Sequence, residues 1–229
     1  MSAQLQDVTL VHTSDIHLGS GYHYDEYLEK IVDVVQLPDV NGLLIAGDLF
    51  DHKEVSQQLV FDTFKKLGET NKPTVILPGN HDTLLTNSNL GFHTPSNIHI
   101  LLKPEGESVL LADLGVNVWG RPVYNHTPEF RPLDKTPDQT KGVWNILMAH
   151  GMVVDSLDDN LRSSPITIGD LTQVDCDYVA LGHVHAFRQI LAGETIAYYP
   201  GTPSGIYEKT LIKVTFESPK RVSVNRVDL

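Results

Sequence analysis

Hydrophobic residues along this chain fall into short runs, and five of these runs end at side chains that can bind a metal ion. The five stretches are VTLVHTSDIH (8–17), GLLIAGDLFD (42–51), TVILPGNHD (74–82), NILMAH (145–150) and YVALGHVH (178–185). A short apolar run bounded by Gly, Pro or Asp is typical of a buried strand. Because open α/β folds bind their ligands where strands end, we expect these polar side chains to meet at one edge of a sheet.

Two segments between the first strands have the apolar spacing of helices. The first covers 25–35, and the second covers 57–69, with Ser56 as its N-cap and Gly68 near its end. Strands that alternate with helices in this order predict right-handed βαβ units and a largely parallel sheet.

The second half of the chain is richer in strands and has few helix signals. The predicted strands are IHILL (98–102), SVLLADLG (108–115), VNVWG (116–120), TIAYYPG (195–201), TLIKVTFE (210–217) and RVSVNRV (221–227). Gly115 fits the turn of a hairpin between two of them. We therefore expect an α/β fold with two sheets packed face to face and helices outside. Residues 121–141 and 155–165 are expected to be surface loops, which commonly set substrate preference beside a rigid site.

Length, charge and cysteine content narrow the possible classes of protein. The 229 residues suit one domain, and we expect a single domain over 1–229 without a separate capping domain. The formal charge is −12 and no stretch is strongly basic, so tight duplex binding by this chain alone is not expected. The sequence has no evident secretory signal, no apolar run of membrane-spanning length and only one cysteine, Cys176. These features predict a cytoplasmic protein, in which Cys176 has a structural role.

The residues that end the five runs have the chemistry of a two-metal site. The candidates are Asp15, His17, Asp48, Asn80, His81, His150, His183 and His185. Carboxylates can bridge two ions, imidazoles and an amide oxygen donate without charge, and a set without thiolate suits Mn²⁺, Fe or Zn²⁺. A single D-x-H or H-x-H is a weak signal, GD-x-x-D a moderate one and GNHD a strong one. Five such pieces in order, each after a strand, are hard to assign to chance.

The motifs together resemble those of the calcineurin-like metallophosphoesterases. The resemblance rests on HTSDIHLG (12–19), AGDLFD (46–51), GNHD (79–82), GHVH (182–185) and YPGTP (199–203). It implies a four-layer α/β/β/α sandwich of two mixed sheets. It also implies a hydrolase that cleaves phosphate esters by attack of a metal-bridging hydroxide, with phosphodiesters as the expected substrates.

The same resemblance implies a role for each motif residue. One ion would be held by Asp15, His17, Asp48 and His185, and the other by Asp48, Asn80, His150 and His183. Asp48 would bridge the two ions. His81 would serve in catalysis by protonating the leaving oxygen or stabilising the transition state, with Asp82 to orient it. Two divalent ions are expected, with manganese first and iron, zinc or nickel as alternatives.

Within the family, the motifs are most similar to the catalytic domain of SbcD-type DNA repair exonucleases. Two functions from this family therefore stay open: a phosphodiesterase for small or single-stranded substrates, and a DNA nuclease that works with a partner, an ATPase in the SbcD-type systems. A third possibility is a non-catalytic scaffold, which the complete ligand set and intact GNHD oppose. Some nucleases have a histidine where this chain has Asp51, for which we expect a supporting role.

Several residues outside the motifs are candidates for substrate contact. Asn80, His23, Tyr124 and Arg188 are the expected substrate-binding residues, and His126 and Arg162 are further candidates. Arginine can bind phosphate through two hydrogen bonds at once, although a surface arginine is more often an ion-pair partner. His12 and His99 alternate with apolar neighbours, so we expect them to be structural.

Overall fold

A computed structural model describes residues 5–20, 24–51, 55–87, 94–157, 164–206 and 208–229. Its first six-stranded sheet has the order β14-β13-β1-β2-β3-β4. The bounds are β1 (Val8–Thr13), β2 (Gly42–Ala46), β3 (Thr74–Leu77), β4 (Ile98–Ile100), β13 (Thr210–Glu217) and β14 (Arg221–Asp228). Strands β1 to β4 run parallel, and the hairpin of β13 and β14 adds two antiparallel strands beside β1.

The second six-stranded sheet has the order β11-β12-β10-β7-β6-β5. The bounds are β5 (Glu107–Leu111), β6 (Val116–Gly120), β7 (Trp144–His150), β10 (Tyr178–Gly182), β11 (Phe187–Ala192) and β12 (Thr195–Pro200). Its four central strands are parallel, and β5 and β11 pair antiparallel at the two edges. A separate parallel pair, β8 (Met152–Val154) and β9 (Pro165–Thr167), lies beyond the end of β7.

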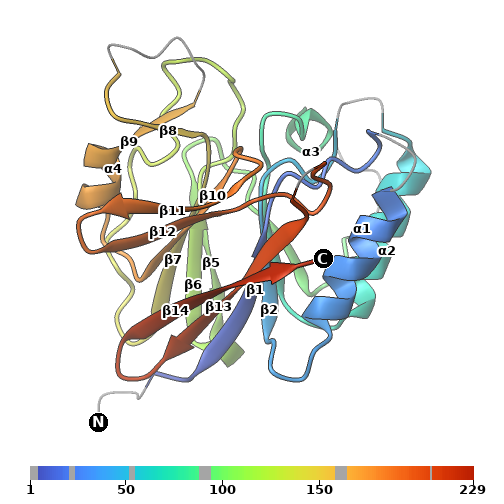
Figure 1. Ribbon diagram of the computed structural model, residues 1–229, viewed down its shortest axis with the longest axis horizontal. Coiled ribbons are helices and arrows are strands. Elements are labelled where there is room, and N and C mark those ends of the chain that lie inside the picture. The colour runs from blue at the N-terminus through green and yellow to red at the C-terminus, as the bar shows by residue number, and fades with distance from the viewer. Residues whose placement is uncertain (1–4, 21–23, 52–54, 88–93, 158–163, 207) are drawn as a thin grey trace.

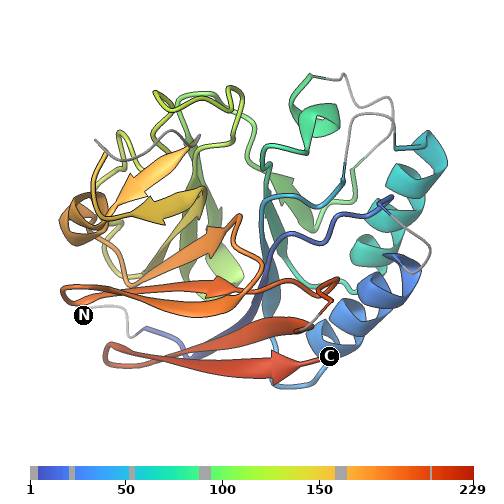
Figure 2. The same cartoon turned by 45° about the horizontal axis from the view of Figure 1, so that its top comes forward.

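Helices cover the outer sides of the two sheets (Figures 1 and 2). Helices α1 (Tyr24–Val35) and α2 (Gln57–Glu69) lie on the first sheet, and the short α4 (Ile168–Gln173) lies on the second. A further short helix, α3 (Thr83–Asn87), follows β3. Buried side chains fill the space between the helices and the first sheet, between the sheets, and between the second sheet and α4. The predicted fold of two mixed sheets with helices outside is therefore confirmed.

Local signals correctly located several elements. Ser56 caps α2, and its hydroxyl accepts a hydrogen bond of 3.2 Å from the amide of Leu59. The expected hairpin forms between β5 and β6, but the first strand ends at Leu111, earlier than predicted. A 3₁₀ turn (Ala112–Leu114) follows, and Gly115 closes it with a φ of 61°. Residues 121–141 contain no helix or strand, as expected.

Helix α4 and the strands β8, β9 and β11 were not predicted from the sequence. A signal for α4 was present, because Thr167 and Asp170 form a capping box in which each side chain accepts from the other residue's amide. The helix has only six residues, too few for its apolar spacing to stand out. Among the described residues, no helix is long and apolar enough to cross a membrane.

Candidate metal centre

The metal-ligand candidates lie in the loops that directly follow β1, β2, β3 and β10, and at the last residue of β7. Four of them have positive φ angles: Asp15 (54°), His17 (52°), Asp48 (54°) and His183 (99°). Such angles are uncommon outside glycine and cluster at functional sites. The backbone turns sharply at the end of three strands, and this turn brings several polar side chains to a common point.

Two glycines leave the room that the site requires. A Cβ atom on Gly47, whose φ is 96°, would lie 2.0 Å from Nδ1 of His150. A Cβ atom on Gly79 would lie 2.2 Å from Oδ1 of Asp48. Any larger residue at either position would displace a ligand candidate. This steric limit explains why glycine precedes Asp48 and Asn80.

Asp15, His17 and His185 form the first group of possible ligands. Nε2 of His185 lies 3.5 Å from Oδ1 of Asp15 and 3.3 Å from Nε2 of His17. The second oxygen of Asp15 accepts a hydrogen bond of 2.9 Å from the amide of His183. Oδ1 is buried, and its partner among the described residues is the His185 ring, itself a ligand candidate, so a cation between them would contact both.

Asp48, His150 and His183 form the second group, and Asn80 lies beside it. Nδ1 of His150 donates to the carbonyl of Ala46 over 2.9 Å, which leaves Nε2 as the donor atom that faces the site. This Nε2 lies 3.3 Å from Oδ2 of Asp48 and 3.1 Å from Oδ1 of Asn80. The His183 and His150 rings are 5.1 Å apart between centroids.

Asp48 lies between the two groups. Its Oδ2 atom is 3.3 Å from Nε2 of His150 and 4.0 Å from Nε2 of His17. Its Oδ1 atom accepts a hydrogen bond of 2.9 Å from the amide of His81, which fixes the orientation of the carboxylate. One carboxylate oxygen therefore faces both groups of donors, as a bridging ligand must.

Burial and mutual charge shift the pKa values across this cluster. Burial favours the neutral form of Asp48, but the adjacent His150 outweighs it and holds the pKa of Asp48 well below its usual value. Burial alone would lower the pKa of His150, yet Asp48 and Asp15 raise it to about 10. Burial and the proximity of His150 lower the pKa of His183 to about 4. Asp48 is thus anionic at neutral pH, as is Asp15, whose pKa is also lowered by its histidine neighbours, and a bound cation would take the place of the His150 proton.

Asp82 supports the backbone of the site, and the structure does not place it against the His81 ring as expected. Its buried carboxylate accepts hydrogen bonds from the amides of Leu49 (3.1 Å), Phe50 (2.8 Å) and Gly79 (2.9 Å). Burial and the nearby charge of Asp48 raise the pKa of Asp82 to about 7. Asp82 thus joins the loop that carries Asp48 to the turn that carries Asn80.

His81 takes its orientation from Asp51. Nδ1 of His81 donates to the backbone carbonyl of Asp51, and the Asp51 carboxylate lies 3.9 Å from the same nitrogen. The carboxylate also lies 3.3 Å from Nδ1 of His17. The His81 side chain is 44% exposed, so its other nitrogen is accessible to a substrate.

The substrate-binding candidates differ in position. Asn80 lies in the site, as described above. The hydroxyl of Tyr124 donates to the carbonyl of Leu102, and Arg188 lies on β11 at the edge of the second sheet. His126 reaches the site from the loop 121–141, with its ring centroid 5.9 Å from that of His183. His23 and Arg162 lie outside the described residues.

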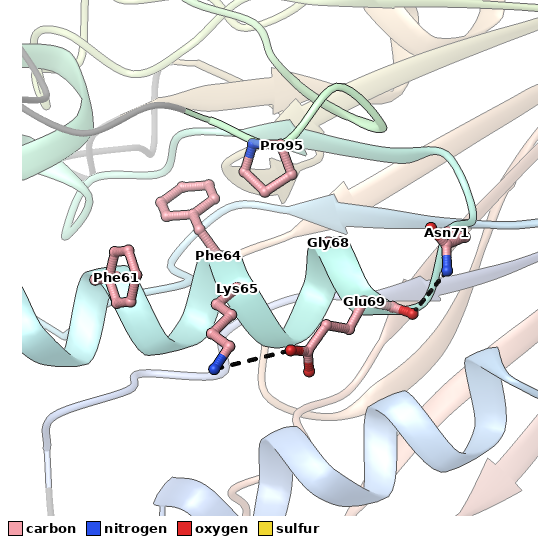
Figure 3. A pocket seen from close by; sticks show the side chains of 7 residues that line it. All are labelled: Phe61, Phe64, Lys65, Gly68, Glu69, Asn71 and Pro95. Carbon is pink, nitrogen blue, oxygen red and sulfur yellow. Dashed lines mark hydrogen bonds and ion pairs between the residues drawn. The ribbon is translucent and has the colours of Figure 1, made fainter.

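A hollow of about 460 Å³ beside α2 does not belong to this site (Figure 3). Its lining consists of Phe61, Phe64, Lys65, Gly68, Glu69, Asn71 and Pro95. None of these residues is a metal-ligand candidate, and Lys65 pairs with Glu69 at its rim over 3.9 Å.

A comparison with models of protein families matches residues 8–187 to the calcineurin-like phosphoesterases. This match includes all five motif-bearing strand ends. The chain belongs to this family. As a calcineurin-like phosphoesterase, it is a member of a group of hydrolases that act on phosphate esters and use divalent metal ions.

Curated relatives of this phosphoesterase include two proteins from Bacillus subtilis (strain 168). The metallophosphoesterase YhaO is 28% identical over an alignment of 222 positions, gaps included, which covers 86% of this chain and 53% of YhaO. The D component of the nuclease SbcCD is 26% identical over an alignment of 249 positions, gaps included, which covers 85% of this chain and 61% of that component. The chain thus spans little more than half the length of these relatives.

Solved structures show the same fold at low sequence identity. The protein TT1561 of Thermus thermophilus superposes with a TM-score of 0.61 at 15% identity, covering 96% of this phosphoesterase and 99% of TT1561. An archaeal phosphodiesterase superposes with a TM-score of 0.52 at 14% identity, covering 96% of this chain and all of that one (100%).

Proposed function

We propose that this protein is a phosphodiesterase that works with two divalent metal ions. The first ion would be held by Asp15, His17, Asp48 and His185, and the second by Asp48, Asn80, His150 and His183. The observation that carries the proposal is the position of Asp48, whose Oδ2 atom faces a histidine of each group. The buried Oδ1 of Asp15, which faces the His185 ring, further supports cation binding, and a set of oxygen and nitrogen donors without thiolate suits Mn²⁺, Fe, Zn²⁺ or Ni²⁺.

Bound ions would lower the pKa of a shared water and withdraw charge from the phosphoryl oxygens. The chain's own residues supply the rest of the chemistry. His81, which is half exposed and held by the Asp51 carbonyl, is placed to protonate the leaving oxygen. Asp82 keeps the loops of Asp48 and Asn80 together, so it acts as a positioning residue. Asn80 can contact the substrate phosphate as well as an ion.

A second candidate function is a DNA nuclease of the SbcD type that acts with a partner. The relative from Bacillus subtilis that is named as part of a nuclease aligns with 85% of this chain, which favours this alternative. The formal charge of −12 opposes strong DNA binding by the chain alone. A partner, an ATPase by analogy with the SbcD-type systems, would have to supply a basic surface.

Hydrolysis assays with Mn²⁺ test both functions. The substrates are bis-p-nitrophenyl phosphate, p-nitrophenyl phosphate and a single-stranded oligonucleotide, and the variants are His81→Ala and Asp48→Asn. We expect diester turnover that falls by roughly a hundredfold or more in both variants, because each removes a group that acts in the transition state. The control His99→Gln changes a histidine of β4 outside the site and retains full activity.

The pattern of activity distinguishes the functions. Turnover of the small diester alone supports the phosphodiesterase, whereas degradation of the oligonucleotide with the same dependence on His81 and Asp48 supports the nuclease. A protein that is inactive with Mn²⁺, Fe²⁺, Zn²⁺ and Ni²⁺ contradicts both and favours a scaffold.

A further inference from the structure

His126, from the loop 121–141, lies beside the metal centre but belongs to neither group of ligand candidates. Its ring meets that of His183 edge-on, with 75° between the planes and 5.9 Å between the centroids. Among the described residues, no hydrogen bond or ion pair engages either nitrogen of the His126 ring, and the residue is exposed. Both nitrogens are therefore available to a bound molecule.

Charges from both sides of the site act on His126. Its pKa is lowered, first by burial and then by His150 and His81, while Asp48 opposes this shift. Asp48 is the carboxylate between the two groups, and the His81 ring lies beside the first group, with its centroid 4.9 Å from that of His17. His126 is thus near the shared centre of the site as well as the second group.

Hydrogen bonds on both sides of His126 hold the loop in place. On its N-terminal side, the amide of Val123 donates to the carbonyl of Pro78 over 3.1 Å, and Pro78 directly precedes the GNHD turn. On its C-terminal side, the carbonyl of Thr127 accepts from the amide of Ser164 over 3.1 Å. The backbone around His126 is therefore joined to the turn that carries two of the site residues.

Arg121 closes the same part of the loop. Its Nε atom donates to the carbonyl of Pro104 over 2.9 Å, and one of its Nη atoms donates to the carbonyl of Arg131 over 3.1 Å. Its guanidinium group also lies 4.8 Å from the ring centre of the buried Phe130. His126 is midway between the two arginines that this hydrogen bond joins. Its backbone is thus placed before a ligand arrives, which reduces the entropy cost of binding.

Imidazoles that are not metal-ligand candidates therefore lie at both ends of the cluster, His81 beside the first group and His126 beside the second. The second group already has four proposed donors, so it does not require His126 as a ligand. Hydrolysis of a phosphate ester spreads negative charge over the non-bridging oxygens, and donors fixed near these oxygens lower the barrier. His81 is assigned to the leaving oxygen, which leaves the non-bridging oxygens for a donor beside the second group.

We propose that His126 is a further catalytic residue, which donates a hydrogen bond to a non-bridging oxygen of the substrate phosphate. His81 and His126 then contact the same phosphate from the two ends of the ligand cluster. This inference rests on the proposed function, because it adds a residue to the same site. It gives the loop 121–141 a direct part in the reaction.

Two substitutions separate the donor from the ring. His126→Phe keeps a flat ring without a donor, and His126→Asn keeps a donor on a shorter side chain. With Mn²⁺ and bis-p-nitrophenyl phosphate, we expect kcat to fall roughly tenfold to a hundredfold in His126→Phe, because a donor to the transition state is lost. The loss in His126→Asn should be smaller. The matched control Asn125→Ala changes the exposed neighbour in the same loop and keeps the wild-type kcat.

Calorimetric titration provides a measurement that does not depend on turnover. Protein loaded with stoichiometric Mn²⁺ is titrated with inorganic phosphate, and the affinity for Mn²⁺ is measured separately. We expect the Kd for phosphate to rise roughly tenfold in His126→Phe and to stay unchanged in Asn125→Ala, because a hydrogen bond to an anion is lost in the first variant only. The affinity for Mn²⁺ should be equal in all of these proteins.

Equal phosphate affinity in the wild type and His126→Phe overturns the assignment, and an unchanged kcat overturns the catalytic role. A lower affinity for Mn²⁺ in His126→Phe would make His126 a metal ligand and also overturns it. A chain that hydrolyses no diester, but whose phosphate binding depends on His126, refutes the proposed function and supports the contact. A chain that binds no divalent metal ion refutes both.

Discussion

His12 is a buried polar residue that joins the two sheets. It lies in β1 of the first sheet, and its Nδ1 atom is 2.9 Å from the hydroxyl of Tyr178 in β10 of the second. Both side chains are fully buried. Burial lowers the pKa of His12 to about 3, so the ring is neutral throughout the physiological range. The structural role expected from its apolar neighbours is consistent with this position.

The neutral state of His12 predicts a dependence of stability on pH. Its pKa is about 3 in the folded protein, against the ordinary histidine value of 6.5 that applies to the unfolded chain. Between these values the unfolded chain takes up a proton that the folded chain does not, so stability falls as pH falls from 6.5 towards 3. The slope from this one group is at most about 1.4 kcal/mol per pH unit.

Urea unfolding at pH 7.5, 6 and 5 in the presence of EDTA measures this effect. The variant His12→Gln cannot take a charge but can still bond to Tyr178, so its free energy of unfolding should fall less steeply with acid than that of the wild type. Parallel curves for the two proteins would show that His12 does not contribute.

At the scale of single elements, the end of α1 depends on a lysine from a distant loop. No basic residue lies in the last turn of this helix. Instead Nζ of Lys72 donates to the carbonyls of Val35 (2.7 Å), Leu37 (2.8 Å) and Val40 (2.7 Å). These carbonyls lie at and after the helix end, where backbone acceptors lack helical partners. One ammonium group thus joins the end of α1 to the start of β3.

Replacing Lys72 by Met should therefore lower the free energy of unfolding by about 1–3 kcal/mol, since three carbonyls lose a charged donor. Thermal or urea unfolding measures the change. The control Lys65→Met removes an exposed lysine of α2 whose pair with Glu69 spans 3.9 Å, and it should cost no more than about 0.5 kcal/mol. Similar losses in both variants would mean that the bonds of Lys72 add nothing specific.

At the scale of the whole molecule, the candidate ligands come from both sheets. Asp15, Asp48 and Asn80 follow strands of the first sheet, whereas His150 and His183 belong to the second. A bound ion would therefore join the two sheets and also reduce the repulsion among buried carboxylates. Folding and metal binding should be coupled.

Mn²⁺ should accordingly raise the melting temperature, and EDTA should reverse the effect. At a free concentration 100 times the Kd, one site stabilises the folded state by about 2.7 kcal/mol. Differential scanning fluorimetry of the wild type and Asp48→Asn measures this shift, which the variant should lose in large part because its bridging carboxylate is gone. His99→Gln should respond like the wild type. An unchanged melting temperature with Mn²⁺, Zn²⁺ and Fe²⁺ would contradict the metal centre.

Much of the fold and of the site could be predicted because their signals are local. The runs at 8–13 and 74–77 are short, apolar and bounded by polar or turn residues, and each forms a buried strand. The N-cap at Ser56 and the turn at Gly115 depend on the residues immediately beside them. The six-residue helix α4 and the three-residue strands β8 and β9 were missed, since elements of this length are stabilised by packing more than by pattern.

By itself, then, the sequence determined three things: the residues at which strands end, the fold class and the family. It could do so because runs of apolar residues form strands that are buried in the fold. Only the tertiary structure decided which of these ends meet. His150 and Asn80 are 70 positions apart, and their contact depends on how the sheets pack. The same packing places the Asp82 carboxylate where it accepts hydrogen bonds from the amides of Leu49, Phe50 and Gly79. It also places the carbonyl of Asp51 where it orients the His81 ring. Contacts between distant segments leave no local pattern, so they appear only once the chain has folded.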